Sequence, residues 1–233
     1  MAPPRPQPIL ILGGFLITAE AYGSMVEQLQ AAVPGQPVVL LPVNRLEWLL
    51  TVVPLGWASI LDRVAREAAA LAAASPTGRI TLIGHSSGGM LLRLFLSDRP
   101  FEGRCYNGRR FADRLICLGS PQTALRATPL RAMVARELPG AFCGDVAYIS
   151  VAGSVDLNPA AGQASATARR LAPGAYRSSS GLADDHGDGL VPVSGALLDG
   201  ATPIVLEGVA HGGAFGPRWY GSADVVEQWW NRS

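Results

Sequence analysis

The chain has 233 residues, of which 48% are hydrophobic and 16% are charged. This balance excludes an intrinsically disordered chain and predicts one globular domain over residues 1–233. The formal net charge is +1 and the basic residues are scattered along the chain, which argues against a nucleic-acid partner.

The cysteines and the N-terminal segment disfavour further classes. Three cysteines, without a C-x-x-C pair or a His/Cys cluster, argue against a disulfide framework and a zinc site. Cys117 is interpreted as a small core residue, and a bridge between Cys105 and Cys143 is left open. Residues 1–8 are rich in proline and do not resemble a secretory signal, and no stretch is long enough to span a membrane. A cytoplasmic protein is therefore expected.

The apolar pattern predicts strands and helices that alternate along the chain. Short apolar runs predict six strands, at 9–12, 38–41, 80–83, 115–118, 146–152 and 203–206. Helical spacing predicts helices at 22–33, 57–74, 90–96, 130–138, around 164–171 and 222–230, with a helical turn at 193–198. Such alternation predicts an α/β fold, a mostly parallel six-stranded sheet with helices on both faces. A site is then expected beyond the carboxyl ends of the strands, where Phe15, Ser86 and Pro121 would converge.

The stretch 80–92 carries the strongest functional signal. It predicts a buried strand, a tight turn with Ser86 at its tip, and an apolar helix, and Gly84, Ser86 and Gly88 match the pattern G-x-S-x-G. A nucleophilic serine needs this shape, because its Oγ must stand clear of the backbone at the end of a strand. The alternative is a Gly/Ser turn between two core elements.

A serine hydroxyl needs a base to accept its proton, and the chain offers three histidines. His211 follows the last predicted strand on a glycine-rich loop and is the predicted base. His186 lies in a polar loop and is the alternative. His85 is next to Ser86 but should point away from its Oγ, so it is interpreted as a packing residue.

The base in turn needs an acid, which should lie between the serine and the histidine in the sequence. Asp188, in Gly187-Asp188-Gly189, is the predicted acid. An Asp-Gly turn without catalytic meaning is its structural alternative. Asp156, Asp184 and Asp185 are the other candidates.

The oxyanion formed on acyl attack needs two backbone donors. We expect the N–H of Ser87, directly after the nucleophile, and the N–H of Phe15, which follows Gly13 and Gly14 after the first strand. This glycine pair is not G-x-G-x-x-G, so dinucleotide binding has no support. The chemistry requires no metal and no organic cofactor.

With these residues placed, the chain resembles the α/β-hydrolase superfamily, and within it bacterial lipases and the lipase-like hydrolases of cyanobacteria and plastids. The resemblance covers the chain nearly end to end and rests on Ile11-Leu12-Gly13-Gly14-Phe15, Gly84-His85-Ser86-Ser87-Gly88-Gly89, Gly187-Asp188-Gly189-Leu190-Val191-Pro192 and Gly208-Val209-Ala210-His211. It implies a Ser-Asp-His triad. The chain departs from the family in two respects: Gly13 stands where many lipases have histidine, and the first two strands of the eight-stranded sheet are missing.

The stretch 48–57 and the segment after Pro121 are the most informative about substrate. Trp48, Leu49 and Trp57 are interpreted either as the buried start of the long helix at 57–74 or as an acyl-binding wall or a surface patch that contacts lipid. Segments 43–57 and 121–145 are candidates for small caps over the site. We therefore expect hydrolysis of an apolar, lipid-like ester, with transient membrane contact as part of that hypothesis. A thioesterase, an acyltransferase and a non-catalytic binding protein are the alternatives, and the oligomeric state is not predicted.

Overall fold

The predicted strands assemble into one sheet whose neighbouring strands are all parallel. The computed structural model describes residues 6–233. The sheet order is β2-β1-β3-β4-β5-β6. The strands are β1 (Ile9–Leu12), β2 (Val38–Leu41), β3 (Ile80–His85), β4 (Ala112–Leu118), β5 (Ala147–Ser154) and β6 (Thr202–Glu207). The predicted fold class is thereby confirmed.

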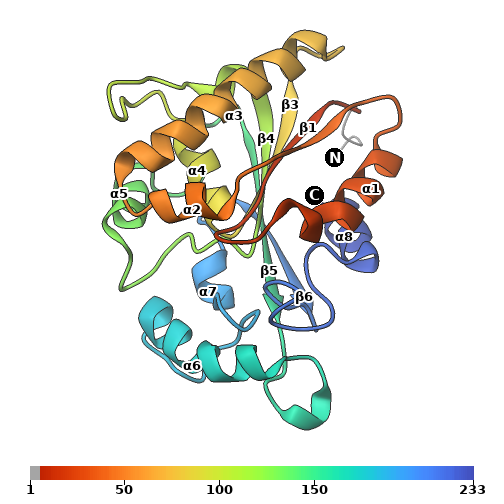
Figure 1. Cartoon of the computed structure of the whole chain (residues 1–233), viewed down its shortest axis with the longest axis vertical. Coiled ribbons are helices and arrows are strands. Elements are labelled where there is room, and N and C mark those ends of the chain that lie inside the picture. The colour runs from red at the N-terminus through yellow and green to blue at the C-terminus, as the bar shows by residue number, and fades with distance from the viewer. Residues whose placement is uncertain (1–5) are drawn as a thin grey trace.

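Helices cover both faces of the sheet because alternate strand residues point to opposite sides (Figure 1). Leu10, Leu12 and Leu82 pack in the cluster of α3 (Pro54–Ala74), α4 (Ser87–Leu96) and α5 (Pro129–Glu137). Ile9 and Ile83 pack on the other face, in the cluster of α1 (Gly23–Ala32) and α8 (Ala223–Trp230). The remaining helical elements are η1 (Ala19–Tyr22), α2 (Arg45–Leu50), η2 (Gly108–Arg110), η3 (Pro159–Ala161), α6 (Ala166–Ser180) and α7 (Val193–Ala196).

Several helices differ from the prediction: α4 begins at Ser87 rather than at residue 90, and α2 was not among the predicted helices. The differences at α3 and α6 have a physical reason. Helix α3 begins at Pro54 rather than at residue 57, because proline at the first helical position has no N–H to leave unpaired. Helix α6 continues to Ser180, although the prediction ended near residue 171, before Pro173. The buried side chain of Tyr176 holds the last turns of α6 against the rest of the chain, and tertiary packing thereby outweighs the lost backbone hydrogen bond.

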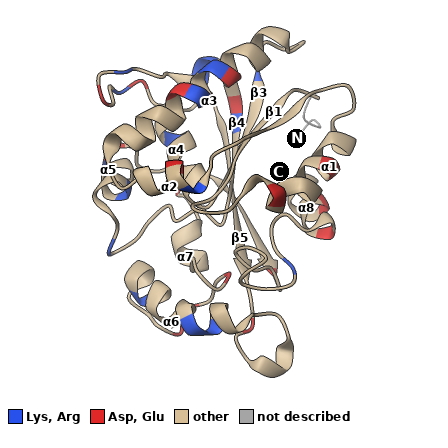
Figure 2. Ribbon diagram, in the orientation of Figure 1, with Lys and Arg blue, Asp and Glu red and all other residues tan. Residues whose placement is uncertain are grey.

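The distribution of charge and the state of the cysteines are as follows. Charged residues of both signs occur on several helices and loops (Figure 2). Cys105, Cys117 and Cys143 are free thiols, so the bridge left open between Cys105 and Cys143 is not formed. Within residues 6–233, no helix combines the length and the apolar character that crossing a bilayer requires. The prediction about residues 1–8 falls partly on residues 1–5, which lie outside the described residues.

The contact between β3 and α4 depends on glycine at position 84. A Cβ at Gly84 would lie 2.4 Å from the Cα of Gly89, which is backbone and cannot move aside. We expect Gly84→Ala to lower the free energy of unfolding by at least about 2 kcal/mol. Gly23→Ala is the matched control, because its Cβ would meet nothing within 4 Å. Chemical denaturation measures both variants, and equal midpoints for the two would contradict the packing argument.

Candidate active site

Ser86 stands on a strained turn between β3 and α4. Its φ is +52° and its ψ is −122°, a conformation that costs a non-glycine residue about 1–3 kcal/mol. The Ser86 N–H donates to the carbonyl of Leu118 at 2.9 Å, which ties the turn to β4. A Cβ at Gly88 would lie 2.3 Å from the carbonyl oxygen of Leu12, so the turn also packs directly on the end of β1. The surrounding backbone therefore holds the strained serine in place.

Three predicted side chains lie in one hydrogen-bonded row at this turn. His211 Nε2 is 3.0 Å from Ser86 Oγ, and His211 Nδ1 is 2.8 Å from Asp188 Oδ2. Because a carboxylate only accepts, Nδ1 carries the proton and Nε2 presents its lone pair to the serine hydroxyl. The backbone N–H of His211 also donates to the carbonyl of Asp188 at 2.8 Å, which joins the two loops.

The Asp188 carboxylate is fully buried and accepts hydrogen bonds on both oxygens. Oδ1 accepts from the backbone N–H groups of Leu190 and Val191, at 3.0 and 2.7 Å. Oδ2 accepts from the hydroxyl of Tyr220 at 2.9 Å in addition to His211. Four donors thus replace the water that a buried charge has lost.

Tyr220 was not found from the sequence. Its hydroxyl oxygen accepts from the Gly153 N–H at 2.6 Å while its proton goes to Asp188, so it connects β5 to the carboxylate. Burial, and then the negative charge of Asp188, raise the pKa of Tyr220 well above its ordinary value. The phenol therefore remains a donor at neutral pH. A tyrosine with no motif around it gives no sequence signal for this role.

Two backbone N–H groups lie beside Ser86 in positions where they could bind an anion. The N–H groups of Phe15 and Ser87 donate to no acceptor among residues 6–233. The loop of Phe15 lies against the turn, since a Cβ at Gly14 would be 2.9 Å from the Cβ of Ser86. Ser87 is the first residue of α4, where the helix macrodipole adds positive partial charge. Both donors are available to a developing anion.

His85 lies behind this turn and is completely buried. Its Nε2 is 2.8 Å from the carbonyl oxygen of His211, so Nε2 carries the proton and Nδ1 accepts from the Tyr22 hydroxyl at 2.7 Å. The Tyr22 oxygen in turn accepts from the N–H of Gly14 at 2.7 Å. His85 is a packing residue, as predicted, and it also links the loops of Gly14 and His211 through hydrogen bonds.

These observations together identify the fold. A parallel sheet carries a serine on a strand–turn–helix elbow, with a free backbone donor after the first strand and the acid and histidine following in the order Ser86, Asp188, His211. The chain has a minimal α/β-hydrolase fold. The sheet that residues 6–233 form has six parallel strands, which is the number predicted.

Comparisons with known proteins were made by sequence and by structure. No protein-family model and no curated protein matches the chain. Solved structures with similarity include a thioesterase domain from the curacin biosynthetic pathway, at 23% identity and a TM-score of 0.36, covering 56% of this chain and 44% of that one. Lipase B of Aspergillus fumigatus matches at 16% identity and a TM-score of 0.43, covering 63% and 37%. An acetylxylan esterase matches at 15% identity and 0.36, covering 52% and 66%. The alignments thus span less than two thirds of each of these chains.

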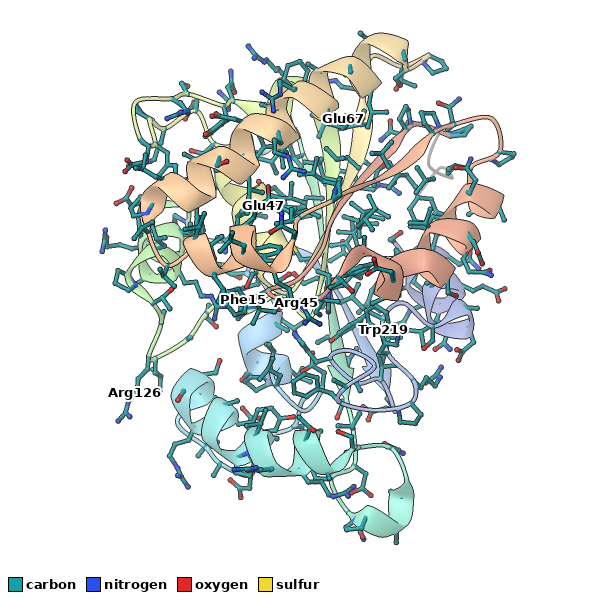
Figure 3. The ribbon with its side chains drawn as sticks, in the orientation of Figure 1. Phe15, Arg45, Glu47, Glu67, Arg126 and Trp219 are labelled. Atoms are coloured by element: carbon teal, nitrogen blue, oxygen red, sulfur yellow. The ribbon has the colours of Figure 1, made fainter. Side chains whose placement is uncertain are left out.

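Two cavities border the Ser86 turn, since Ser87 lines one and Ser86 lines the other. The first has a volume of about 390 Å³ and an apolar lining that includes Phe15, Trp57, Ser87, Leu91 and Leu130. The second has a volume of about 290 Å³ and is lined by Ser86, Pro121, Leu190 and Val191, together with arginine and serine residues. Figure 3 shows Phe15 in the loop beside α2, at the centre of the molecule.

The predicted substrate residues fall into three groups. Trp57 lines the first cavity and Pro121 lines the second. Trp48 is in the core, 1% exposed, and packs edge-on against Phe15 with ring centroids 6.2 Å apart. Leu49 is half-exposed and lines neither cavity. Trp48 is therefore buried, as one alternative expected, but it lies in the short helix α2 and not at the start of the long helix α3.

The alternative acids and base lie away from Ser86. His186 is exposed, and its backbone N–H donates to Asp185 rather than its ring contacting Ser86. Asp156 accepts from the backbone N–H of Asn158 within its own loop. Neither Asp156 nor Asp184 lines the two cavities.

His85 predicts a pH dependence of stability. Burial, and then the charge of His211, hold the pKa of His85 well below its ordinary value of 6.5. Below pH 6.5 the unfolded chain binds a proton that the folded chain does not, so stability falls as pH falls, by up to about 1.4 kcal/mol per pH unit. We expect a shallower loss of unfolding free energy between about pH 7 and 5 in His85→Gln than in the wild type. The exposed His186→Gln is the control and should keep the wild-type slope; a wild-type slope in His85→Gln would disprove this role.

Proposed function

We propose that the chain hydrolyses carboxylic esters of apolar acyl groups through an acyl-enzyme on Ser86. The observation that carries this proposal is the row Ser86–His211–Asp188, with separations of 3.0 and 2.8 Å and a buried carboxylate at its end. A serine that shares a hydrogen bond with an oriented imidazole is an activated nucleophile.

The proposed reaction has two steps. Ser86 Oγ attacks the ester carbonyl while His211 Nε2 takes its proton, and the oxyanion is bound by the N–H groups of Phe15 and Ser87. The imidazolium then returns the proton to the leaving alkoxide, and the alcohol departs. In the second step His211 takes a proton from water, which attacks the acyl-enzyme, and Ser86 recovers its proton as the free acid leaves.

The first cavity is the proposed acyl-binding site, because it is apolar and borders both N–H donors. Residues from 43–57 and from 121–145 line it, and we propose that these two segments act as caps over the site. Val52, which lines this cavity, is exposed, as are Leu49 and Leu55 nearby in the sequence, and we propose that this segment is where contact with a lipid surface would occur. Membrane contact and the identity of the acyl acceptor, water or another alcohol, stay predictions.

Loss of the nucleophile tests the function directly. Ser86→Ala should lower kcat for a p-nitrophenyl ester by about 10⁴-fold or more, and Asp188→Asn by about 10³- to 10⁴-fold, because the histidine loses its orientation. Labelling with a fluorophosphonate, read by intact mass and peptide mapping, should place one adduct on Ser86 only. His186→Ala is the matched control and should retain wild-type activity. A folded wild-type protein that forms no adduct and releases no acid would refute the proposal.

Filling the first cavity should change the preferred chain length. Leu130 lines this cavity, so Leu130→Trp should lower kcat/KM for an octanoate ester by about tenfold relative to an acetate ester. The control is Leu125→Trp, since Leu125 is 73% exposed and is not part of the lining. Steady-state rates over a series of acyl chain lengths provide the measurement. If both variants keep the wild-type profile, the acyl group binds elsewhere.

A further inference from the structure

Arg131 lies at the junction of the two cavities, beside the proposed nucleophile. It belongs to the lining of both, and its Nη2 donates to the Ser87 hydroxyl at 3.1 Å. It is the third residue of α5, so its guanidinium projects from the first turn of that helix. The side chain thus reaches the residue directly after Ser86 from the segment proposed as a cap.

Within residues 6–233 the Arg131 guanidinium forms no ion pair with an acidic side chain, and its position is unfavourable for stability. No Asp or Glu belongs to the described lining of either cavity. Elsewhere the chain pairs arginine with acid, as in Arg63–Glu47, Arg104–Asp62 and Arg218–Asp224. Burial without such a partner lowers the pKa of Arg131 below its ordinary value, although an arginine keeps its charge in proteins. A positive charge in the first turn also opposes the helix macrodipole.

The two cavities differ in chemistry. The first is lined mainly by apolar side chains, and Arg131 is the one charged residue in its described lining. The second contains Arg126 as well as Arg131, together with Ser178 and Ser179. Arg126 is exposed and lies at the outer edge of the molecule (Figure 3), so Arg131 is the inner of the two charges. The second cavity therefore combines two positive charges with hydroxyl groups next to Ser86.

We propose that the leaving group of the substrate carries an anionic oxygen group, a carboxylate or a phosphate, which binds Arg131 in the second cavity. This inference rests on the proposed function, and it adds the class of alcohol to the class of acid. Guanidinium binds either anion through two parallel hydrogen bonds, and a partly buried site strengthens them. The acyl chain lies in the apolar cavity, the ester carbonyl lies at Ser86, and the charged alcohol extends toward Arg126.

Matched pairs of esters test the proposal. Butyryl glycolate and butyryl glycolamide have similar size, but only the first carries a carboxylate; 2-phosphoethyl butyrate supplies the phosphate, with its dimethyl ester as the neutral partner. Wild-type kcat/KM should be about 10- to 100-fold higher for at least one anionic ester than for its neutral partner. Comparison of the two anionic esters identifies the group. Arg131→Gln should reduce that ratio to near one, and Arg131→Lys should restore part of it.

Three controls separate substrate binding from a structural role. Arg136→Gln changes an arginine on the same helix that already pairs with Glu137, and should leave the ratio unchanged. Ser87→Ala removes the side-chain hydroxyl that accepts from Arg131 and should keep the preference for the anion. If Arg131 merely positions Ser87 or stabilises the oxyanion, Arg131→Gln slows both members of a pair equally, which overturns the proposal.

Binding to an inactive variant distinguishes this proposal from the proposed function. Calorimetry with Ser86→Ala and the intact esters should show at least about tenfold tighter binding of the anionic member, lost in Ser86→Ala/Arg131→Gln. A binding preference without turnover by the wild type would refute the hydrolase and retain the anion site. Turnover of both members without any preference would refute the anion site and retain the hydrolase.

Discussion

The strained backbone of Ser86 is the constraint on which the other features depend. A residue with a side chain does not adopt φ +52° and ψ −122° without support, and here the support comes from three strands. The N–H of Ser86 binds β4 through Leu118, while the helix that follows packs on β3 and on the end of β1. These contacts fix the backbone conformation of Ser86, and that conformation sets the direction of its hydroxyl. Sheet topology and proposed chemistry are therefore coupled through one residue.

A second constraint is the cost of burying the Asp188 carboxylate. The charge is tolerated because four donors from three segments converge on it, namely Leu190 and Val191, Tyr220, and His211. Each donor also holds in place a loop that follows β5 or β6. The hydrogen bonds that stabilise the buried charge therefore also orient the imidazole of His211. Loss of one donor would therefore destabilise the Asp188 carboxylate and would also displace the other donors.

Much of this arrangement could be predicted from the sequence, and the remainder could not for a physical reason. Strands buried on both faces appear in the sequence as continuous apolar runs, and a nucleophilic serine is flanked by glycines in a recognisable motif. Short segments of sequence are therefore enough to predict the sheet and Ser86. Tyr220, Tyr22 and Arg131 act through contacts with residues 32, 63 and 44 positions away. Such pairs exist only after folding. Trp48 illustrates a different problem. The sequence pattern around an apolar residue near a site is the same whether its side chain contacts the substrate or packs in the core.

Gly13, where many lipases have histidine, has a structural explanation in this chain. A Cβ at Gly13 would lie 2.9 Å from the ring of Tyr22, so that ring fills the space a larger residue would need. The same tyrosine binds the N–H of Gly14 and, through His85, the carbonyl of His211. The loop that carries the Phe15 N–H is thus held by Tyr22 from η1 and His85 from β3 instead of by a side chain of its own. Gly13 and Tyr22 depend on each other, because a histidine at position 13 would displace the Tyr22 ring that supports the loop.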